Sequence, residues 1–172
     1  TCQQLQLLHP GPLKFIAPMA SAHTAGQFAA QVRGAGAPIQ LLTGGADQAL
    51  AAADVALVAS GTATLQALLH GVPMVVAYRL APVTAFIARD LGLVKVRHFS
   101  LPNLLAGEEL VPEFFQQAVQ PLRLAGALHA MLTDEVHRER LRRRFRDIHA
   151  ALRAGCAQRA AAVLGELLVR KD

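Results

Sequence analysis

A short polar turn between two apolar stretches carries the residue types that bind an anion. Ser60-Gly61-Thr62 follows the apolar run Asp54–Val58 and precedes a helical pattern that begins at Ala63. Glycine lets backbone approach a ligand, and hydroxyls together with the free N–H groups of a helix N-terminus can receive phosphate oxygens. The turn therefore predicts a phosphate site or, if Ser60 or Thr62 only accepts a backbone N–H, a simple helix N-cap.

Tyr78 and Arg79 form a second polar position, at the end of the apolar run Pro73–Tyr78. In open α/β sheets, ligands bind outside the carboxyl ends of the strands, which is where we expect this pair to lie. Arg79 is therefore a candidate to meet a phosphate or an anionic headgroup, unless its guanidinium is simply solvated.

The segment SLPNLLAG, Ser100–Gly107, is expected to be an irregular but structured loop because it combines Pro, Asn and Gly. Loops of this kind commonly carry function, and the Asn103 amide offers both a donor and an acceptor. The alternative is that Asn103 caps a local turn while Leu104 and Leu105 fill the core.

Three acids follow that loop, Glu108, Glu109 and Glu113, and Pro112 marks an expected helix start. Acids near a helix N-terminus are stabilised by its macrodipole, which is a purely structural explanation. A carboxylate at this place could instead bind ribose hydroxyls, and the sequence alone favours neither reading.

Several kinds of catalytic and cofactor site are not indicated. The seven histidines show no metal-ligand spacing such as HExxH, and none pairs with a cysteine. GxSxG, Walker A and GxGxxG motifs are absent as well, which removes most support for a P-loop or a dinucleotide site. We therefore expect no metal and no cofactor.

Composition and length limit the possible architectures. The 172 residues are 53% hydrophobic and only 17% charged, a balance that suits one packed domain and excludes a disordered chain. Cys2 and Cys156 stand far apart and are expected to be reduced thiols, as in a cytosolic protein. We expect no signal peptide, because the N-terminus lacks a basic segment followed by an apolar run, and no membrane-spanning helix, because polar residues interrupt the most apolar stretch.

The net charge of +5 is concentrated near the C-terminus. Residues 134–172 contain ten basic and six acidic side chains, and six arginines lie between Arg138 and Arg146. Such a cluster favours an anionic partner, which can be nucleic acid, an acidic lipid headgroup or a phosphorylated ligand. The alternative is a solvated helix face with partly paired charges.

Apolar and helical patterns alternate over the first hundred residues. Strands are expected at 13–18, 38–42, 54–58 and 73–78, and helices at 27–33, 47–52, 63–70 and 83–91. The strands are nearly continuous apolar runs, as in a sheet covered on both faces. The prediction is an α/β fold with a Rossmann-like parallel sheet flanked by helices.

The C-terminal part is expected to be helical over 121–132 and 136–169, with a break at Gly155. Along the second helix one apolar stripe recurs at helical spacing. Its members are Leu141, Phe145, Ile148 and Leu152. We divide the chain into an α/β part at 1–133 and an Arg-rich helical extension of the same domain at 134–172.

Between Ala53 and Leu110 the sequence strongly resembles lipid-A-disaccharide synthase, a family of bacterial glycosyltransferases. The turn ASGTATL, the strand PMVVAYR and the loop SLPNLLAG follow one another as in the C-terminal half of that family. The likeness continues more loosely through VPEFFQ and the terminal helices, and backwards to Leu13. It therefore covers most of the chain.

The resemblance implies that residues 1–133 are the nucleotide-sugar-binding domain of a GT-B glycosyltransferase. This family transfers 2,3-diacylglucosamine from UDP-2,3-diacylglucosamine to 2,3-diacylglucosamine 1-phosphate and releases UDP, without a metal, at the cytoplasmic face of the bacterial inner membrane. The implied partners are the UDP-sugar donor, a lipid substrate, an anionic membrane surface and a second copy in a homodimer, but no nucleic acid. By position, the substrate-binding residues would be Ser60, Gly61, Thr62, Gln66, Tyr78, Arg79, Asn103, Glu109 and Gln116.

Two positions depart from the family pattern, because Gln66 stands where the family has Glu and Glu108 stands where it has Arg. Gln66 can keep a hydrogen bond to a ribose hydroxyl but not a charge-assisted one, and Glu108 should disfavour an anion. The acceptor-binding half, the expected catalytic Asp and an upstream Gly-Ser-Arg phosphate loop have no counterpart here. This chain alone should therefore not catalyse transfer.

Three functional readings stay open. The first is the donor-binding half of the transferase, active only with its other half. The second is a non-catalytic remnant that binds UDP or dimerises. The third is a domain of another UDP-sugar enzyme, such as a GlcNAc transferase or an epimerase, and the SLPNLLAG segment argues against it.

Overall fold

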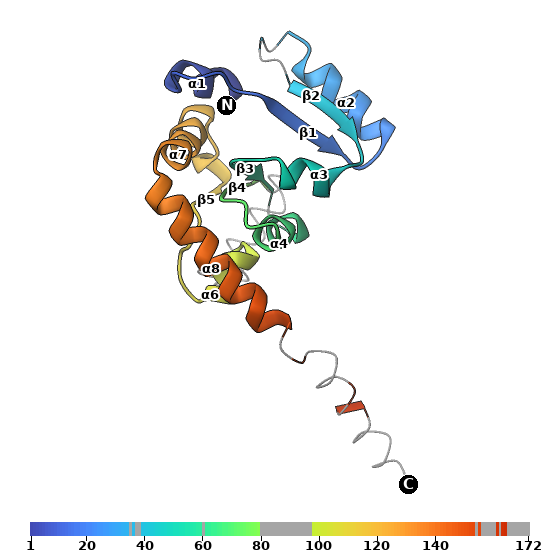
Figure 1. Ribbon diagram of the computed structural model, residues 1–172. Helices are drawn as coiled ribbons and strands as arrows, with labels where there is room; N and C mark the ends of the chain where they lie inside the picture. Colours follow the sequence, from blue (N-terminus) through green and yellow to red (C-terminus); the bar gives the residue numbers. More distant parts are fainter. Residues whose placement is uncertain are drawn as a thin grey trace.

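The computed structural model describes residues 1–34, 36, 39–59, 61–79, 98–153, 155, 161 and 163–164 (Figure 1). The expected helix over 83–91 lies outside the described residues, as do Ser60, Cys156 and almost all of the chain after Arg153. In chain order the elements are α1 (Cys2–Leu8), β1 (Phe15–Met19), α2 (Ala22–Val32), β2 (Ile39–Thr43), α3 (Ala46–Ala51), β3 (Ala56–Val58), α4 (Thr62–Leu69), β4 (Met74–Tyr78), α6 (Leu101–Ala106), β5 (Glu113–Phe115), the 3-10 turn η1 (Gln116–Ala118), α7 (Pro121–Thr133) and α8 (Glu135–Arg153).

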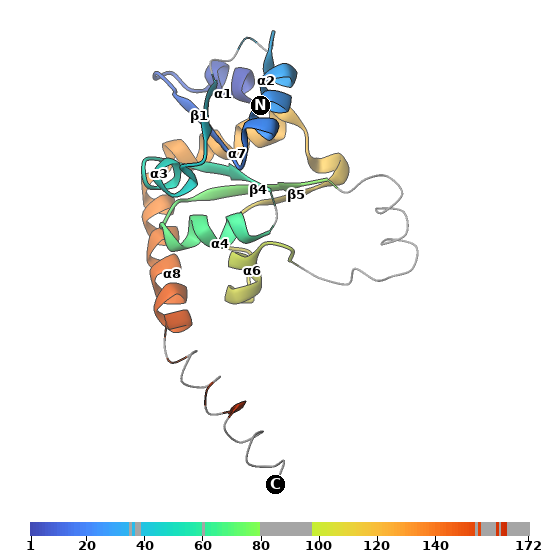
Figure 2. The same ribbon diagram turned by 90° about the vertical axis from the view of Figure 1, so that its right-hand side faces the viewer.

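The strands form parallel sheets, as predicted. β1 pairs with β2, and β3, β4 and β5 pair in that order, with every described pairing parallel. Figure 2 shows β4 and β5 side by side, with α4 on one face of this sheet and α7 on the other. The predicted α/β class, with a parallel sheet between helices, is confirmed.

β4 is the centre of the core because it has a strand on each side and helices on both faces. Met74 and Val76 belong to a cluster with α4 and α8, whereas Val75 belongs to a cluster with α1 and α7. All three side chains are fully buried. The unbroken apolar run in the sequence follows from this burial on alternate faces.

The two C-terminal helices meet at a turn that is held by side chains. Asp134 accepts the N–H of His137 at 2.8 Å, which caps the start of α8. Arg138 donates to the carbonyl oxygens of Met131 and Leu132 at the end of α7. Neither α8 nor any other helix among the described residues is long and apolar enough to cross a membrane.

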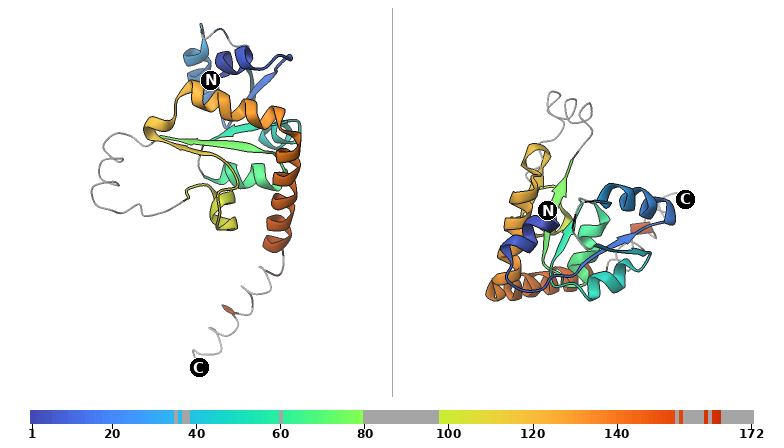
Figure 3. Two further views of the ribbon diagram at one scale, coloured as in Figure 1. Left: turned by 90° about the vertical axis from the view of Figure 1, so that its left-hand side faces the viewer. Right: turned by 90° about the horizontal axis from the view of Figure 1, so that it is seen from above.

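α8 packs at the amino-terminal end of β4, away from the end where the strand points (Figures 2 and 3). Leu141 and Phe145 of the predicted stripe are buried in the core, and Ile148 packs partly buried against it. Leu152 lies beyond the core and is exposed. Gly155 follows with φ +74°, in the left-handed region where helices commonly end.

Two expectations for the middle of the chain are wrong. The segment at 100–107 is not irregular, because Leu101–Ala106 forms α6 with the Ser100 hydroxyl as its cap and Pro102 in its first turn, where no N–H is needed. Pro112 does not start a helix, since the strand β5 follows it. The sequence pattern also missed α1, a short helix that leads into β1.

Candidate functional site

The carboxyl ends of β3, β4 and β5 meet at one edge of their sheet, because the three strands are parallel. We call it the carboxyl edge. Gly61 and Thr62 follow β3, Arg79 follows Tyr78 at the end of β4, and Gln116 follows β5. Figure 2 shows the start of α4 near the ends of β4 and β5. The fold thus brings these five candidate residues to the edge where such sheets bind ligands.

The N-terminus of α4 lies open at the carboxyl edge. Gly61 is its N-cap, with φ +130°, so Thr62 is the first helical residue, and no described side chain caps the helix. A Cβ at Gly61 would meet nothing within 4 Å in the described part of the chain, which leaves room beside this turn there. Gln66 lies one turn after Thr62, and both are exposed. The unpaired N–H groups of a helix start suit an anion.

Thr64 fixes this turn from the interior. Its hydroxyl donates to the Gly61 carbonyl oxygen at 2.7 Å and accepts the N–H of Leu101 at 3.3 Å, which links the starts of α4 and α6. The side chain is fully buried. Sequence reasoning missed Thr64, because a hydroxyl in the first turn of a helix has the same pattern whether it faces solvent or the next helix.

Arg79 contacts backbone instead of pointing freely into solvent. Its Nε donates to the carbonyl oxygen of Gln116 at 3.3 Å, and its Nη2 donates to that of Val119 at 2.6 Å. Gln116 has φ +50°, a conformation that is uncommon for a residue with a side chain. Its Nε2 is buried and has no hydrogen-bond partner among the described residues. A buried amide donor without a partner, held in a strained turn, is a typical feature of a ligand site.

Aromatic rings line the same edge. Tyr78 and Phe115 are opposite each other in the β4–β5 register, and their rings stack with centroids 6.4 Å apart and planes at 25°. Phe99 adds a tilted contact to Phe115 at 5.7 Å. Phe115 is still 39% exposed. An exposed ring beside hydrogen-bond donors suits a flat ligand ring.

The Asn103 amide is occupied within the protein. It is fully buried, its Nδ2 donates to the Val111 carbonyl oxygen at 2.9 Å, and its Oδ1 accepts the N–H groups of Leu110 and Val111 at 2.8 and 2.9 Å. Asn103 therefore holds the turn that leads into β5. Leu104 and Leu105, expected to fill the core in that reading, are instead exposed.

The three acids considered for ribose binding have different surroundings. The Glu113 carboxylate accepts two backbone N–H groups at the start of α6, at 2.8 and 3.1 Å. Glu108 stands where the family pattern has Arg. Its carboxylate forms an ion pair with Arg144 of α8 at 2.5 Å, which offsets the negative charge of Glu108. Glu109 is exposed. Among the described residues, no three His, Cys, Asp or Glu side chains are placed to hold a metal ion.

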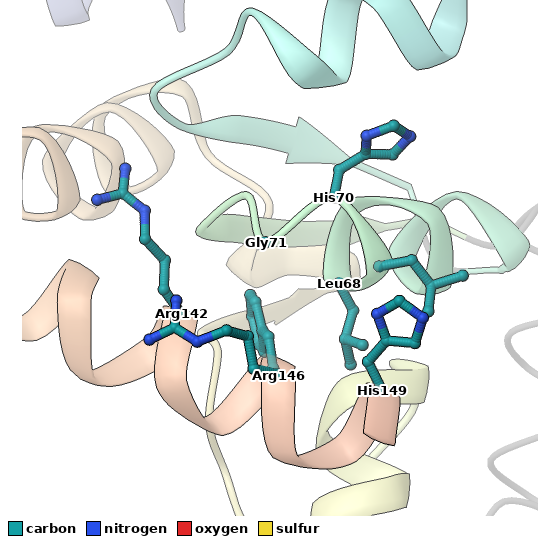
Figure 4. A pocket seen from close by; sticks show the side chains of 8 residues that line it. Leu68, His70, Gly71, Arg142, Arg146 and His149 are labelled. Atoms are coloured by element: carbon teal, nitrogen blue, oxygen red, sulfur yellow. The ribbon is translucent and has the colours of Figure 1, made fainter. Parts of the chain in front are cut away.

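A hollow of about 260 Å³ lies away from the carboxyl edge, at the other end of α4 (Figure 4). It is lined by Leu68, Leu69, His70, Gly71, Arg142, Phe145, Arg146 and His149. Glu139 lies 3.8 Å from Arg142 and 3.2 Å from Arg146, and the hydrogen bond from Arg146 is the main cause of its lowered pKa. These arginines are thus paired, and a helix C-terminus carries partial negative charge. The hollow is therefore a poorer anion site than the start of α4.

Comparisons with known proteins agree on one family. The family model described as lipid-A-disaccharide synthetase matches residues 1–166. The chain is 50% identical to the lipid-A-disaccharide synthase of Alkalilimnicola ehrlichii over 155 residues, which are 88% of the chain and 40% of that relative. It is 47% identical to that of Azotobacter vinelandii over 170 residues, which are 98% and 43% of the two chains. It is 44% identical to that of Pseudomonas aeruginosa strain PAO1 over 172 residues, which are 99% and 44%.

The chain thus spans about two fifths of the length of the relatives that it matches. The match extends over nearly all of the chain, through the carboxyl edge, α6 and α8. By this match, the chain belongs to the lipid-A-disaccharide synthetase family.

Proposed function

We propose that this chain is the donor-binding part of a glycosyltransferase of lipid A biosynthesis. The enzyme would transfer 2,3-diacylglucosamine from UDP-2,3-diacylglucosamine to 2,3-diacylglucosamine 1-phosphate and release UDP. One observation carries the proposal: the start of α4 and the buried Gln116 amide, neither with a side-chain partner among the described residues, share the carboxyl edge with the exposed Phe115 ring. An anion site, a polar donor and an aromatic surface together match a nucleoside diphosphate.

Each part of the nucleotide has a proposed contact. The diphosphate would lie on the backbone N–H groups at Gly61 and Thr62, which the α4 dipole makes favourable for negative charge. The uracil ring would lie against Phe115, and the Gln116 amide would donate to an oxygen of the base or the ribose. Gln66 and Glu109, both exposed, are proposed to meet hydroxyls of the ribose or the sugar.

The role of these residues in transfer is to bind UDP as it leaves. The bond between the anomeric carbon and the β-phosphate oxygen breaks, its electron pair stays on UDP, and an acceptor hydroxyl forms the new bond to the anomeric carbon. Preorganised N–H groups at the start of α4 would stabilise the charge that grows on the phosphate oxygen. The base that takes the acceptor proton is proposed to lie in the part of the enzyme that this chain does not span.

Two further residues are proposed to position the site. Arg79 holds the turn that contains Gln116, through its bonds to two carbonyl oxygens. Asn103 holds the backbone that leads into β5, whose last residue is Phe115. Neither side chain needs to touch the nucleotide: loss of Arg79 should weaken binding through the Gln116 turn, whereas loss of Asn103 should mainly lower stability.

We also propose that the protein is peripheral at the cytoplasmic face of the bacterial inner membrane, where its lipid substrate would be reached. Supporting this, α8 carries seven arginines against three acids. Arg140 is exposed and has no ion pair among the described residues. The Arg-rich face of α8 would meet anionic lipid or lie close to a contact between two copies in a homodimer.

The alternative is a non-catalytic remnant that binds UDP or dimerises. Both proposals predict UDP binding. The two proposals differ once the chain is combined with the part of a relative that lies outside the match. Only a donor-binding half would then support transfer.

Calorimetric titration of the purified chain with UDP, with ADP as the control nucleotide, tests the shared claim. We expect UDP to bind and ADP to bind much more weakly. Gln116→Leu should weaken UDP binding roughly tenfold, because a buried donor contact worth about 1–2 kcal/mol is lost. Gln117→Leu is the matched control, since Gln117 is the exposed neighbour. Equal losses in both variants, or equal binding of UDP and ADP, would contradict the proposed site.

A further inference from the structure

The first helix of the chain, α1, is attached to the rest of the fold mainly through α7. The two helices pack against each other and lie side by side in Figure 1. Leu5 is the buried residue of α1, and it belongs to a core cluster with Leu124, Ala125 and Leu128 of α7. The attachment of α1 therefore has one apolar anchor.

A pair of histidines forms a second contact between the two helices. His9 directly follows α1, His129 lies on α7, and their rings meet edge to face with centroids 5.7 Å apart and planes at 73°. The turn after α1 closes on the His9 ring, because a Cβ added at Gly11 would lie 3.2 Å from its Nε2 atom. Each ring has a buried Nδ1 atom without a hydrogen-bond partner in the described part of the chain.

This contact suits two neutral rings. An edge-to-face arrangement is favourable between uncharged aromatic rings, and a neutral imidazole can leave one nitrogen as an unprotonated acceptor. In an imidazolium both nitrogens are N–H donors, so a protonated His9 or His129 would have a buried Nδ1–H without an acceptor. Two charged rings at this separation would also repel each other. Protonation of the pair should therefore oppose the packing of α1 on α7.

No carboxylate on α1, α7 or β4 can compensate a charge on the pair. The sequence contains no Asp or Glu at 1–46, at 74–78 or at 114–133. Burial raises the pKa of the Cys2 thiol, so this group is neutral in acid. Besides the two histidines, the titratable or charged groups of these elements and of the turn after α1 are the amino group of Thr1, the Cys2 thiol, Lys14, Tyr78 and Arg123.

The remaining element that packs on α7 is α8, and it brings a cation to the end of α7. Arg138 donates to two carbonyl oxygens there, close to one turn beyond His129. The two acids at the start of α8 already have partners, because Glu135 pairs with Arg138 and Asp134 accepts the N–H of His137. The surroundings on this side therefore also favour a neutral His129.

The C-terminal end of α1 acts in the opposite direction, because a helix C-terminus favours a positive charge such as that of a protonated His9. The effect is small for an exposed helix end and is screened by salt. It supplies no acceptor to either buried Nδ1 atom among the described residues. The unpartnered N–H and the repulsion between the rings therefore outweigh it.

We infer that the His9–His129 pair is a pH switch that holds α1 on α7 while both rings are neutral and releases α1 when the pair is protonated. Imidazole is the side chain that ordinarily changes its charge between about pH 5 and about pH 8, so the release should fall in this range. The contribution of the pair is present at the higher pH and is lost as the pH falls.

The release should be local. The core cluster around Met74, Leu141 and Phe145 contains no residue of α1, so it can persist when α1 leaves. The cluster that contains Leu5 would lose its cover on α7, and Val75 of β4 belongs to the same cluster. This inference goes beyond the proposed function and holds whether or not a nucleotide binds at the carboxyl edge.

Amide hydrogen exchange of the chain without nucleotide tests the inference at about pH 8 and about pH 5. Rates are corrected for the effect of pH on unstructured amides. The His9 N–H, which donates to the Leu5 carbonyl oxygen at 2.9 Å, should lose protection at least about tenfold at the lower pH. The Val72 N–H, which donates to Ala67 at 2.9 Å in the other cluster, should change less than about twofold. Equal protection of His9 at both pH values overturns the inference, as does an equal loss at Val72.

Substitutions assign the effect to the pair. His129→Phe keeps an aromatic ring on α7 but removes the proton site, so the protection of His9 should no longer depend on pH. His23→Phe is the matched control, since His23 is an exposed histidine on α2, and it should keep the full dependence. A His129→Phe chain that retains the dependence contradicts the inference.

A measurement on the unchanged protein covers the case in which His129→Phe does not fold. The imidazole resonances of His9 and His129 are followed by NMR as the pH is lowered, together with the backbone amides of α1. Rings and amides should change with one common midpoint. Titration of the rings without any change in α1 overturns the switch. Because no nucleotide is used, failure here is distinct from failure of the UDP titration.

Discussion

The Nε atom of Arg79 lies 3.3 Å from the carbonyl oxygen of Gln116, a residue 37 positions later in the chain. This bond joins the end of β4 to the turn after β5. It helps to hold Gln116 at φ +50°, with the amide nitrogen buried and without a partner among the described residues. Because strained residues persist only where their surroundings fix them, these bonds support the proposal that Arg79 positions the carboxyl edge.

Arg79→Gln should therefore affect both folding and binding. The variant loses charge-assisted bonds to the carbonyl oxygens of Gln116 and Val119, so the free energy of unfolding should fall by about 1–2 kcal/mol, discounted for partial exposure. UDP affinity should fall as well, because the Gln116 turn relaxes. Urea unfolding and calorimetry measure the two effects. Arg140→Gln removes an equal charge from an exposed position that has no ion pair within the described part of the chain, and it should change neither.

Asn103→Ala separates a positioning role from direct contact. The substitution leaves the carbonyl oxygen and N–H of Val111 and the N–H of Leu110 without partners in a buried site, so the free energy of unfolding should fall by about 3 kcal/mol. Nucleotide affinity of the remaining folded protein should change by less than about threefold. A large loss of UDP affinity with unchanged stability would instead make Asn103 a direct ligand.

The charge network of α8 should make stability depend on pH in a defined direction. The pKa of Glu139 is lowered, chiefly by the hydrogen bond from Arg146, so the folded state favours the charged carboxylate. Glu139 therefore stabilises the fold above the ordinary carboxyl pKa, and this contribution is lost as the pH falls through the lowered pKa. Glu139→Gln should show a smaller fall in Tm than the unchanged protein between about pH 7 and about pH 3. Asp147→Asn is the matched control, because it removes a carboxylate of the same helix that has no ion pair among the described residues.

Membrane binding should depend on the exposed arginines of α8 and on salt. Retention on vesicles that contain phosphatidylglycerol should fall as salt rises, because exposed charges are screened. Arg140→Glu combined with Arg143→Glu should weaken retention at least about tenfold, at about 1 kcal/mol for each basic residue near the surface. Arg123→Glu, an exposed arginine on α7, is the control for charge reversal elsewhere. Retention on the vesicles that changes neither with salt nor with these substitutions would exclude an electrostatic contact.

The parallel strands were predictable because a strand that is buried on both faces is a continuous apolar run in the sequence. The run Pro73–Tyr78 is apolar throughout, and it coincides with β4 apart from its first residue. The end of α4 was equally readable, because Gly71, at φ +70°, follows the last helical turn. Such signals depend only on neighbouring residues, so they can be recognised in a single sequence.

The segment around Ser100 was misread because the same residues serve loops and helix starts. Pro102 breaks a helix in its interior but is favoured in the first turn, where Ser100 provides the cap. The strand β5 is three residues long, and its acid, Glu113, points to backbone N–H groups of another segment. Neither relationship has a periodic pattern.

The candidate site was partly predictable. Gly61 and Arg79 follow strands and Tyr78 ends one, and the rule for parallel sheets places all three at one edge. The bond from Arg79 to Gln116 and the internal use of the Asn103 amide depend on tertiary contacts between segments distant in sequence. Residue types alone do not distinguish a side-chain amide that contacts a ligand from one that holds a turn of the backbone.

The most direct test of the account is to locate the nucleotide on the protein. Backbone N–H resonances of the isotopically labelled chain would be recorded during a titration with UDP. We expect the largest shifts at Gly61, Thr62 and Gln116, with little change at Gly71 and His149, which line the hollow at the end of α4. Shifts confined to Gly71 and His149, or no shifts at a concentration that saturates calorimetric binding, would contradict a donor site at the carboxyl edge.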